Sequence, residues 1–209
     1  MCERPIIFST VMVRAIVEGR KTQTRRVVKW PIMSESDGAK RRLWTPDDIA
    51  SLNDILKERA AHPNWRPTPY RLGMRLWVRE TWATTEQSGD HPSDAYPVYR
   101  ATDPGWENME GWRWRSPIHM PRWASRLTLE VEAVRVERLQ DISEEDARDE
   151  GVYACHSQSP GLEAEPYYRS LQSPQRLFSM LWNSINAKRG FPWASNPWVF
   201  VIDFSRVIG

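Results

Sequence analysis

The segment of the sequence with the clearest chemical potential runs from Glu18 to Arg26 and reads EGRKTQTRR. Lys21 stands two residues after Gly19, where a predicted helix ends, and Thr24 supplies a hydroxyl three residues further on. Neighbouring arginines disfavour the protonated form of a lysine, and a neutral lysine can act as a general base toward a hydroxyl. Lys21 and Thr24 are therefore a candidate base and nucleophile.

The spacing of this pair leaves other interpretations open. Residues three apart in a regular strand point to opposite faces, so Lys21 and Thr24 can cooperate only across a turn or bulge. A cluster of cations behind a glycine also fits a phosphate-binding surface or a solvated basic loop. In each case Arg25 is expected to lie on the surface.

A second candidate stands in the acidic segment 137–150. Seven acids occur there beside two arginines, and most of them fit the exposed surface and first turn of a helix capped by Ser143. Glu150 differs because it falls at the C-terminal end of that helix, just before Gly151, where the helix dipole disfavours a carboxylate. An acid at this position needs a cationic partner, and the basic segment offers one.

Aromatic residues form a third group. The chain has twelve tryptophans in 209 residues, and several stand in or next to the segment 102–117. Trp112 and Trp114 alternate there with arginines, which fits base stacking combined with phosphate contact, and His119 and Arg122 follow closely. Tryptophans that fill gaps beneath loops give the same pattern, so stacking and packing are both open interpretations.

Composition narrows the class of protein. The formal net charge of +2 conceals six basic residues and one acid between Arg14 and Lys29, a local positive field that favours anionic partners. The only cysteines are Cys2 and Cys155, which excludes a disulfide framework and disfavours zinc, so neither a metal nor a cofactor is expected. No apolar run approaches the roughly 18 residues of a membrane helix, so a cytoplasmic protein without membrane contact is expected.

The order of the predicted elements indicates the fold class. Strands are predicted at 4–10, 23–30, 72–83, 96–101, 126–139 and 196–207, and helices at 10–18, from Thr45 onward, at 143–150 and at 173–186. The apolar alternation in 126–139 shifts by one residue near Val134, which predicts a bulge or a turn between two strands. Residues 33–69 are interpreted as a surface insertion. This order, without a βαβ rhythm, favours an α+β fold around a small β-barrel.

Four segments in this order resemble the ASCH domain of the PUA-like superfamily: EGRKTQTRR, LGMRLWVRETW, LQDISEEDARDEG and NPWVFVIDF. The family signature G-x-K-x-x-[E/T]-x-R is matched by Gly19, Lys21, Thr24 and Arg26. The resemblance implies a single domain over residues 1–209, with a PUA-like small β-barrel, flanking helices and a basic, aromatic-lined cleft. The resemblance covers about two-thirds of the chain: the insertion at 33–69, much of 101–117, which holds the Trp-rich loop at 102–117, and much of 155–172 lie outside it. The whole chain also resembles proteins encoded in phages and prophages of enteric bacteria.

The resemblance also implies an activity. One bacterial ASCH branch hydrolyses N4-acetylcytidine with a lysine, a threonine and a glutamate, which correspond to Lys21, Thr24 and Glu150. In that scheme Thr24 attacks the acyl carbonyl, Lys21 accepts its proton, and Glu150 positions Lys21 or protonates the leaving amine. Substrate or nucleic-acid contacts are expected from Arg26, Arg79, Glu80, Trp82, Trp114, His119 and Arg122. The expected partner is RNA or a modified nucleoside or nucleotide, in the cytoplasm of a bacterial host.

The favoured function is therefore a nucleic-acid or modified-nucleotide-binding protein that hydrolyses an N4-acylated cytosine or a related amide. Three alternatives stay open. The same cleft can bind RNA or a modified base without catalysis, or it can belong to a ribonuclease, a role associated with ASCH members that carry Glu at the position of Thr24. The third alternative is a phage morphogenesis or host-interaction protein that uses its Trp-rich surface against another protein.

Overall fold

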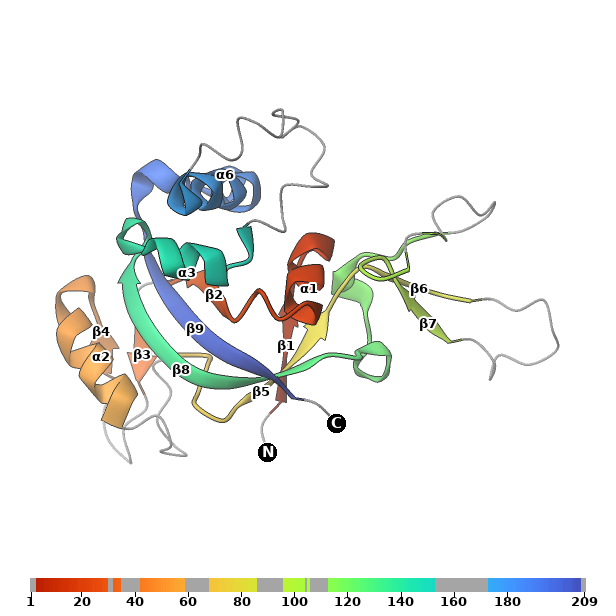
Figure 1. Ribbon diagram of the computed structural model, residues 1–209. Helices are drawn as coiled ribbons and strands as arrows, with labels where there is room; N and C mark the ends of the chain where they lie inside the picture. The colour runs from red at the N-terminus through yellow and green to blue at the C-terminus, as the bar shows by residue number, and fades with distance from the viewer. Residues whose placement is uncertain are drawn as a thin grey trace.

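The computed structural model describes residues 3–29, 32–34, 42–58, 68–85, 96–103, 105, 113–152 and 173–207. These residues form a mixed α+β structure, as the sequence predicts, with one large curved sheet and helices packed on it (Figure 1). The predictions for Trp106 and Trp112 in the Trp-rich loop, and for the polar segment around Cys155, lie outside the described residues.

The central sheet has five strands in the order β1, β5, β8, β9, β2. They are Glu3–Ile7 (β1), Gln23–Val27 (β2), Arg75–Arg79 (β5), Thr128–Arg138 (β8) and Trp198–Val207 (β9). β1 pairs with β5 in parallel, and the other neighbours pair antiparallel. Among the described strands, β1 and β2 stand at the two edges of this sheet, so the observed pairing does not close it into the expected barrel.

Strand β9 is buried on both faces, which explains its nearly continuous apolar sequence. Phe200, Ile202 and Phe204 belong to one core cluster, and Val199 and Val201 belong to another. Because successive strand residues point to opposite faces, the side chains of the residues at odd positions share the face of the second cluster. Asp203 therefore lies on that face, although it interrupts an apolar run.

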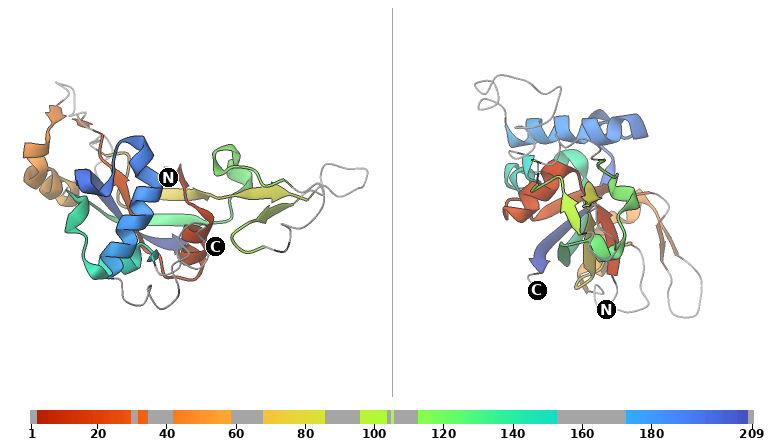
Figure 2. Two further views of the ribbon diagram at one scale, coloured as in Figure 1. Left: turned by 90° about the horizontal axis from the view of Figure 1, so that it is seen from above. Right: turned by 90° about the vertical axis from the view of Figure 1, so that its right-hand side faces the viewer.

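Four helices cover the sheet, and they divide between the two clusters. They are α1 (Thr10–Val17), α2 (Ile49–Glu58), α3 (Glu144–Asp149) and α6 (Pro174–Asn186). Helices α1 and α2 contribute buried side chains to the first cluster, whereas α3 and α6 pack together over the second (Figures 1 and 2). The face that holds Asp203 is thus the face beneath α3 and α6.

Serine residues start three of these helices: the sequence predicts Ser143 and Ser173 as caps, and it leaves Ser9 and Thr10 as alternatives for the first helix. The side chains of Ser9, Ser143 and Ser173 accept hydrogen bonds from backbone N–H groups in the first turns of α1, α3 and α6. Gly19 and Gly151 follow α1 and α3 with φ angles of 74° and 79°, the left-handed conformation that glycine adopts without steric cost. The basic segment and Glu150 therefore both stand at helix ends.

The segment interpreted as a surface insertion contributes to the main core. It contains the hairpin of β3 (Ile32–Ser34) and β4 (Arg42–Trp44), and Thr45 caps a 3-10 turn, Pro46–Asp48, that continues into α2. Leu52 and Leu56 of α2 are buried in the first core cluster. The side-chain oxygen of Asn53 accepts a hydrogen bond from the Val136 N–H at 2.8 Å, and its Nδ2 donates to the Val136 carbonyl at 2.9 Å. Asn53 thus covers the edge of β8 beyond its pairing with β5.

Two strand predictions meet different outcomes. The single strand predicted at 72–83 is wrong: β5 ends at Arg79, and β6 (Trp82–Thr84) pairs with β7 (Pro97–Tyr99) in a separate two-stranded sheet. The chain leaves the large sheet because Trp82 and its neighbour Ala83 are both buried under local packing rather than alternating. The shift predicted within 126–139 is confirmed as a bulge inside one strand, between Val131 and Ala133.

Candidate functional site

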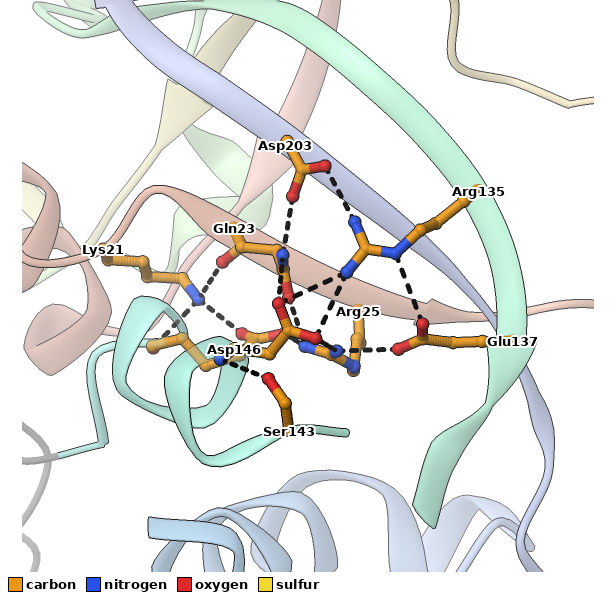
Figure 3. A network of polar contacts seen from close by, with 9 residues as sticks. Lys21, Gln23, Arg25, Arg135, Glu137, Ser143, Asp146 and Asp203 are labelled. Atoms are coloured by element: carbon orange, nitrogen blue, oxygen red, sulfur yellow. Dashed lines mark hydrogen bonds and ion pairs between the residues drawn. The ribbon is translucent and has the colours of Figure 1, made fainter. Parts of the chain in front are cut away.

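Lys21 is buried, not displayed on a solvated loop. Its ammonium donates hydrogen bonds to the Gln23 carbonyl at 2.7 Å, the Glu150 carbonyl at 3.0 Å and the Glu150 carboxylate at 2.6 Å (Figure 3). The exposed fraction of its side chain is 0%. An ammonium has three donor hydrogens, and these three acceptors match them in number. The geometry describes a charged lysine held tightly against Glu150.

Glu150 reaches this position because Gly151 permits a close approach of two helix ends. A Cβ at Gly151 would lie 2.8 Å from the Cβ of Ala15 and 3.2 Å from the Cβ of Lys21. The backbone N–H of Lys21 also donates to the Ala15 carbonyl at 3.0 Å, which ties the basic segment to α1. Glu150, at the C-terminal end of α3, thus meets the cationic partner that its place in the helix predicts.

Thr24 lies in the edge strand β2, opposite Ile202 of β9, and is buried. It lines a cavity of about 300 Å³ together with Glu150 and Arg26. The cavity lies where β2 meets the connection between β1 and α1, with α6 as its other wall. Lys21 lines a separate cavity of about 400 Å³ and donates to Glu150, which lines the first one. The structure therefore brings Thr24, Arg26 and Glu150 to one cavity, with Lys21 behind the carboxylate.

Arg25 is the clearest correction to the sequence predictions. It was expected on the surface, but the exposed fraction of its side chain is 0%. Its guanidinium donates to Glu137 at 2.7 Å and to Asp146 at 3.0 Å, and lies 3.4 Å from the Glu150 carboxylate. A buried arginine requires such partners, and they come from β8 and α3, far from Arg25 in the sequence.

Arg25 belongs to a larger polar network on the sheet face beneath α3 and α6 (Figure 3). Gln23 donates to Asp146 at 3.0 Å and to Asp203 at 2.6 Å, and Arg135 donates to Asp203 at 2.8 Å. Burial acts to raise the pKa of Asp146, but the Gln23 hydrogen bond and the nearby Arg25 and Arg135 charges outweigh it and hold that pKa below its usual value. The network joins β2, β8, β9 and α3 around the candidate site.

The sequence predictions missed most of this network: Gln23, Arg135, Glu137, Asp146 and Asp203 were not site candidates. One signal was available. Asp203 interrupts the apolar run VFVIDF of a strand buried on both faces, and a lone carboxylate in such a strand needs a buried partner. Its face of the sheet then identifies Gln23, which is paired with Asp203 across β2 and β9.

The other predicted binding residues gather around β5, β6 and the turns that follow Trp114. Glu80 is buried and accepts two hydrogen bonds from Arg126, at 2.9 and 3.0 Å. Burial raises the pKa of Glu80, and the Arg126 hydrogen bonds and charge only partly offset this effect. Trp82 is buried against Met120 and Ala124. Glu80 and Trp82 are thus engaged inside the protein.

Arg79 and Arg122 instead flank an accessible ring. Their guanidinium carbons lie 5.4 and 5.9 Å from the centroid of Trp77, within cation–π range. Arg79 also donates to backbone carbonyls of Ile118 and Met120, and Arg122 pairs with Glu3 at 2.9 Å. His119 is exposed in the adjoining 3-10 turn, Pro117–His119, and Trp114 is half-buried.

Trp123, which the sequence places with His119 and Arg122 in the neighbourhood of the Trp-rich loop, is the most exposed large hydrophobic residue of the described chain, at 65% exposure. Its ring stands edge-on to Trp82, with 5.8 Å between centroids, so the buried ring supports the exposed one. Ile118, whose carbonyl accepts a hydrogen bond from Arg79, is 57% exposed. We refer to Trp77, Ile118 and Trp123, with the cations Arg79 and Arg122, as the aromatic surface.

Comparison with known proteins finds no matching family model, no matching curated protein and no matching solved structure. Within the described ranges, no cluster of His, Cys, Asp and Glu side chains has the arrangement of a metal site. The helices of the described residues include none that is long and apolar enough to span a membrane.

Proposed function

We propose that this protein is an ASCH-type, PUA-like enzyme of the cytoplasm that binds a modified nucleoside or nucleotide and hydrolyses an amide on its base. The observation that carries the proposal is the buried Lys21–Glu150 ion pair, 2.6 Å long, beside a cavity that both Glu150 and Thr24 line. Burial of a charged lysine and a charged glutamate has a desolvation cost that their mutual attraction does not always offset. Such a pair is therefore weak evidence for a purely stabilising role. Buried, paired ionisable groups next to a cavity are found at many active sites.

The proposed reaction is hydrolysis of an N4-acylated cytosine. The Thr24 oxygen attacks the acyl carbon, and its proton passes to Glu150, which lines the same cavity. The bond from carbon to N4 breaks as that proton moves to N4, which releases cytosine and leaves an acyl ester on Thr24. Water then attacks the ester, Glu150 transfers the proton, and the carboxylic acid leaves as the hydroxyl of Thr24 is restored.

This scheme moves proton transfer from Lys21, where the family resemblance suggests it, to Glu150. The reason is geometric: the three hydrogen bonds of the Lys21 ammonium run to Gln23 and Glu150, and Glu150 is the member of the pair that faces the cavity. Lys21 then acts as a positioning residue that holds the carboxylate. Arg25 assists through its 3.4 Å contact with the other carboxylate oxygen.

The test is hydrolysis of N4-acetylcytidine by purified protein, followed by chromatographic detection of cytidine. Thr24→Val keeps the buried volume but removes the hydroxyl, so we expect it to abolish turnover. Thr22→Val is the matched control, because Thr22 is exposed and is not among the residues that line the Thr24 cavity. An inactive wild-type protein, or full activity in Thr24→Val, would contradict the proposal.

The aromatic surface favours one second candidate function, the non-catalytic binding of single-stranded RNA. Trp123 is exposed and is supported by the Trp82 ring, and Trp77 has two arginines within cation–π range. Such rings offer stacking for bases, and the arginines offer charge for phosphates. Stacking of one base is worth about 1–3 kcal/mol, so Trp123→Ala should weaken binding of a short RNA by about tenfold. Leu72→Ala removes an exposed apolar side chain elsewhere and is the control. Salt-insensitive binding, or equal affinities of the two variants, would exclude this function.

A further inference from the structure

The Thr24 cavity has two unlike walls. Its apolar wall comes mainly from α6 and its polar wall mainly from β2. Phe178, Leu181, Trp182 and Ile185 form the apolar wall, and Ile7 and Met12 extend it. The polar side includes Thr24, Arg25, Arg26, Glu150, Asn186 and Arg189. A ligand that fills this cavity therefore combines an apolar or aromatic part with a group that accepts hydrogen bonds from arginine.

The charges on the polar wall are unequally compensated. Arg25 faces three carboxylates, those of Glu137, Asp146 and Glu150, so its charge is neutralised inside the protein. Within the described part of the chain, neither Arg26 nor Arg189 has a carboxylate partner. Among the described residues that line the cavity, Arg26 and Arg189 are thus the two cations that have no ion pair with a carboxylate.

Arg26 is also incompletely bonded. Its guanidinium donates to the Ile7 carbonyl at 2.7 Å and stands 5.3 Å from the centroid of Phe8. Its Nε is buried and has no hydrogen-bond partner among the described residues. The Arg26 guanidinium therefore has donor capacity beyond its bond to the Ile7 carbonyl. Arg189, at the end of the 3-10 turn Ala187–Arg189 that follows α6, is exposed and free to turn toward the same ligand.

We infer that Arg26 and Arg189 bind the phosphate of the ligand, so that the natural ligand of the cavity is a nucleoside monophosphate rather than a free nucleoside. This inference rests on the proposed function and specifies its substrate class. Guanidinium groups bind phosphate oxygens through paired, charge-assisted hydrogen bonds, and two arginines on one cavity form a dianion site. The apolar wall on α6 receives the base or its acyl group.

The test is calorimetric binding of cytidine, cytidine 5′-monophosphate, cytidine 3′-monophosphate and inorganic phosphate to the full-length protein. These ligands carry no acyl group, so the measurement does not depend on turnover. We expect at least one monophosphate to bind about tenfold more tightly than cytidine. The reason is that a hydrogen bond to a charged group contributes more to the binding free energy than one between neutral groups. The advantage should shrink as salt rises. Phosphate alone should bind more weakly than the monophosphate.

Arg189→Gln provides the specific variant, because this exposed side chain supports no described contact and its loss should leave the fold intact. It should remove most of the phosphate advantage and leave cytidine affinity unchanged. Lys188→Gln is the matched control, since Lys188 is an exposed neighbouring cation outside the cavity lining. Equal affinities for cytidine and its monophosphates, or a full phosphate advantage in Arg189→Gln, would overturn the inference and leave the proposed function standing. Absence of binding by every ligand would also overturn the inference, and the turnover assay with N4-acetylcytidine tests the proposed function separately.

Discussion

The Lys21 ammonium lies 2.6 Å from the Glu150 carboxylate, and neither side chain is exposed by more than 2%. These residues come from two helix ends that Gly151 allows to touch. The pair links the basic segment after α1 to the acidic helix α3, and so it joins the two charge clusters that are separate in the sequence. Its burial has consequences for stability as well as for chemistry.

Removal of Lys21 should destabilise the protein strongly. Lys21→Met leaves Glu150 buried beside Arg25 alone, and breaking a buried pair typically lowers the free energy of unfolding by about 3–5 kcal/mol. The double variant Lys21→Met, Glu150→Gln leaves no unpaired charge from this pair, so part of the loss should return. Urea unfolding followed by tryptophan fluorescence measures both. If Lys21→Met were as stable as the wild type, the ion pair between Lys21 and Glu150 would not contribute to the free energy of unfolding.

Two arginines of the same basic segment should differ in their effect on stability. Arg25→Lys removes the planar fork that contacts Glu137, Asp146 and Glu150, and we expect a loss of about 2–4 kcal/mol in unfolding free energy. Arg20→Lys is the control, because the side chain of Arg20 is 42% exposed and pairs with Glu18, where surface ion pairs contribute about 0–1 kcal/mol. Similar losses in the two variants would contradict the buried network.

Gly151 should be far less tolerant of substitution than Gly73. Both have positive φ angles, 79° and 70°, so an alanine at either position is strained by about 1 kcal/mol. At Gly151 the added methyl would also meet Ala15 at 2.8 Å, whereas at Gly73 nothing lies within 4 Å. Thermal unfolding of the two alanine variants should therefore show a clearly larger drop in Tm for Gly151→Ala. Equal drops would mean that the helix ends are not in contact.

The Glu80–Arg126 pair predicts a pH dependence. Burial raises the folded-state pKa of Glu80 above its unfolded value, so its stabilising contribution is full below the unfolded pKa, near about 4.3, and declines as pH rises through the folded value. In Arg126→Met the compensating charge is lost, so the variant should lose more stability, relative to wild type, at pH 7.5 than at pH 5.

The control for this pH dependence is the double variant Glu80→Gln, Arg126→Met, which has no carboxyl to titrate at this site. Its stability relative to wild type should differ much less between the two pH values. Urea unfolding of all three proteins at pH 5 and pH 7.5 supplies the comparison. A loss in Arg126→Met that is independent of pH would mean that Glu80 does not carry the buried charge.

Local patterns in the sequence predicted the helix starts well. Ser9, Ser143 and Ser173 cap helices because a cap is a short-range interaction within four residues. The burial of Arg25 was not predictable in this way, since its partners Glu137 and Asp146 lie 112 and 121 residues further along the chain. The basic residues of the segment by themselves indicate solvent exposure, although the fold buries Lys21 and Arg25.

The residues of the candidate site were predictable where a short-range pattern marks them, and not where their position depends on packing between distant segments. The dipole argument selected Glu150 from one helix, and the chemistry of the basic segment selected Lys21 and Thr24, which the family signature also matches. Strand alternation alone does not identify Trp123, because its exposure depends on the packing of Trp82 beneath it. The end of β5 at Arg79 was missed because the apolar residues beyond it continue the sequence pattern while packing elsewhere.

The account depends most on Thr24 acting as a nucleophile in the cavity that it shares with Glu150. The most direct measurement is rapid quenching of the protein with N4-acetylcytidine, followed by peptide mass spectrometry. An acetyl group on Thr24, absent from the Thr24→Val variant and formed at a rate that supports turnover, is the predicted result. Hydrolysis of N4-acetylcytidine that proceeds without an acetyl group on Thr24 and persists in Thr24→Val would contradict the account.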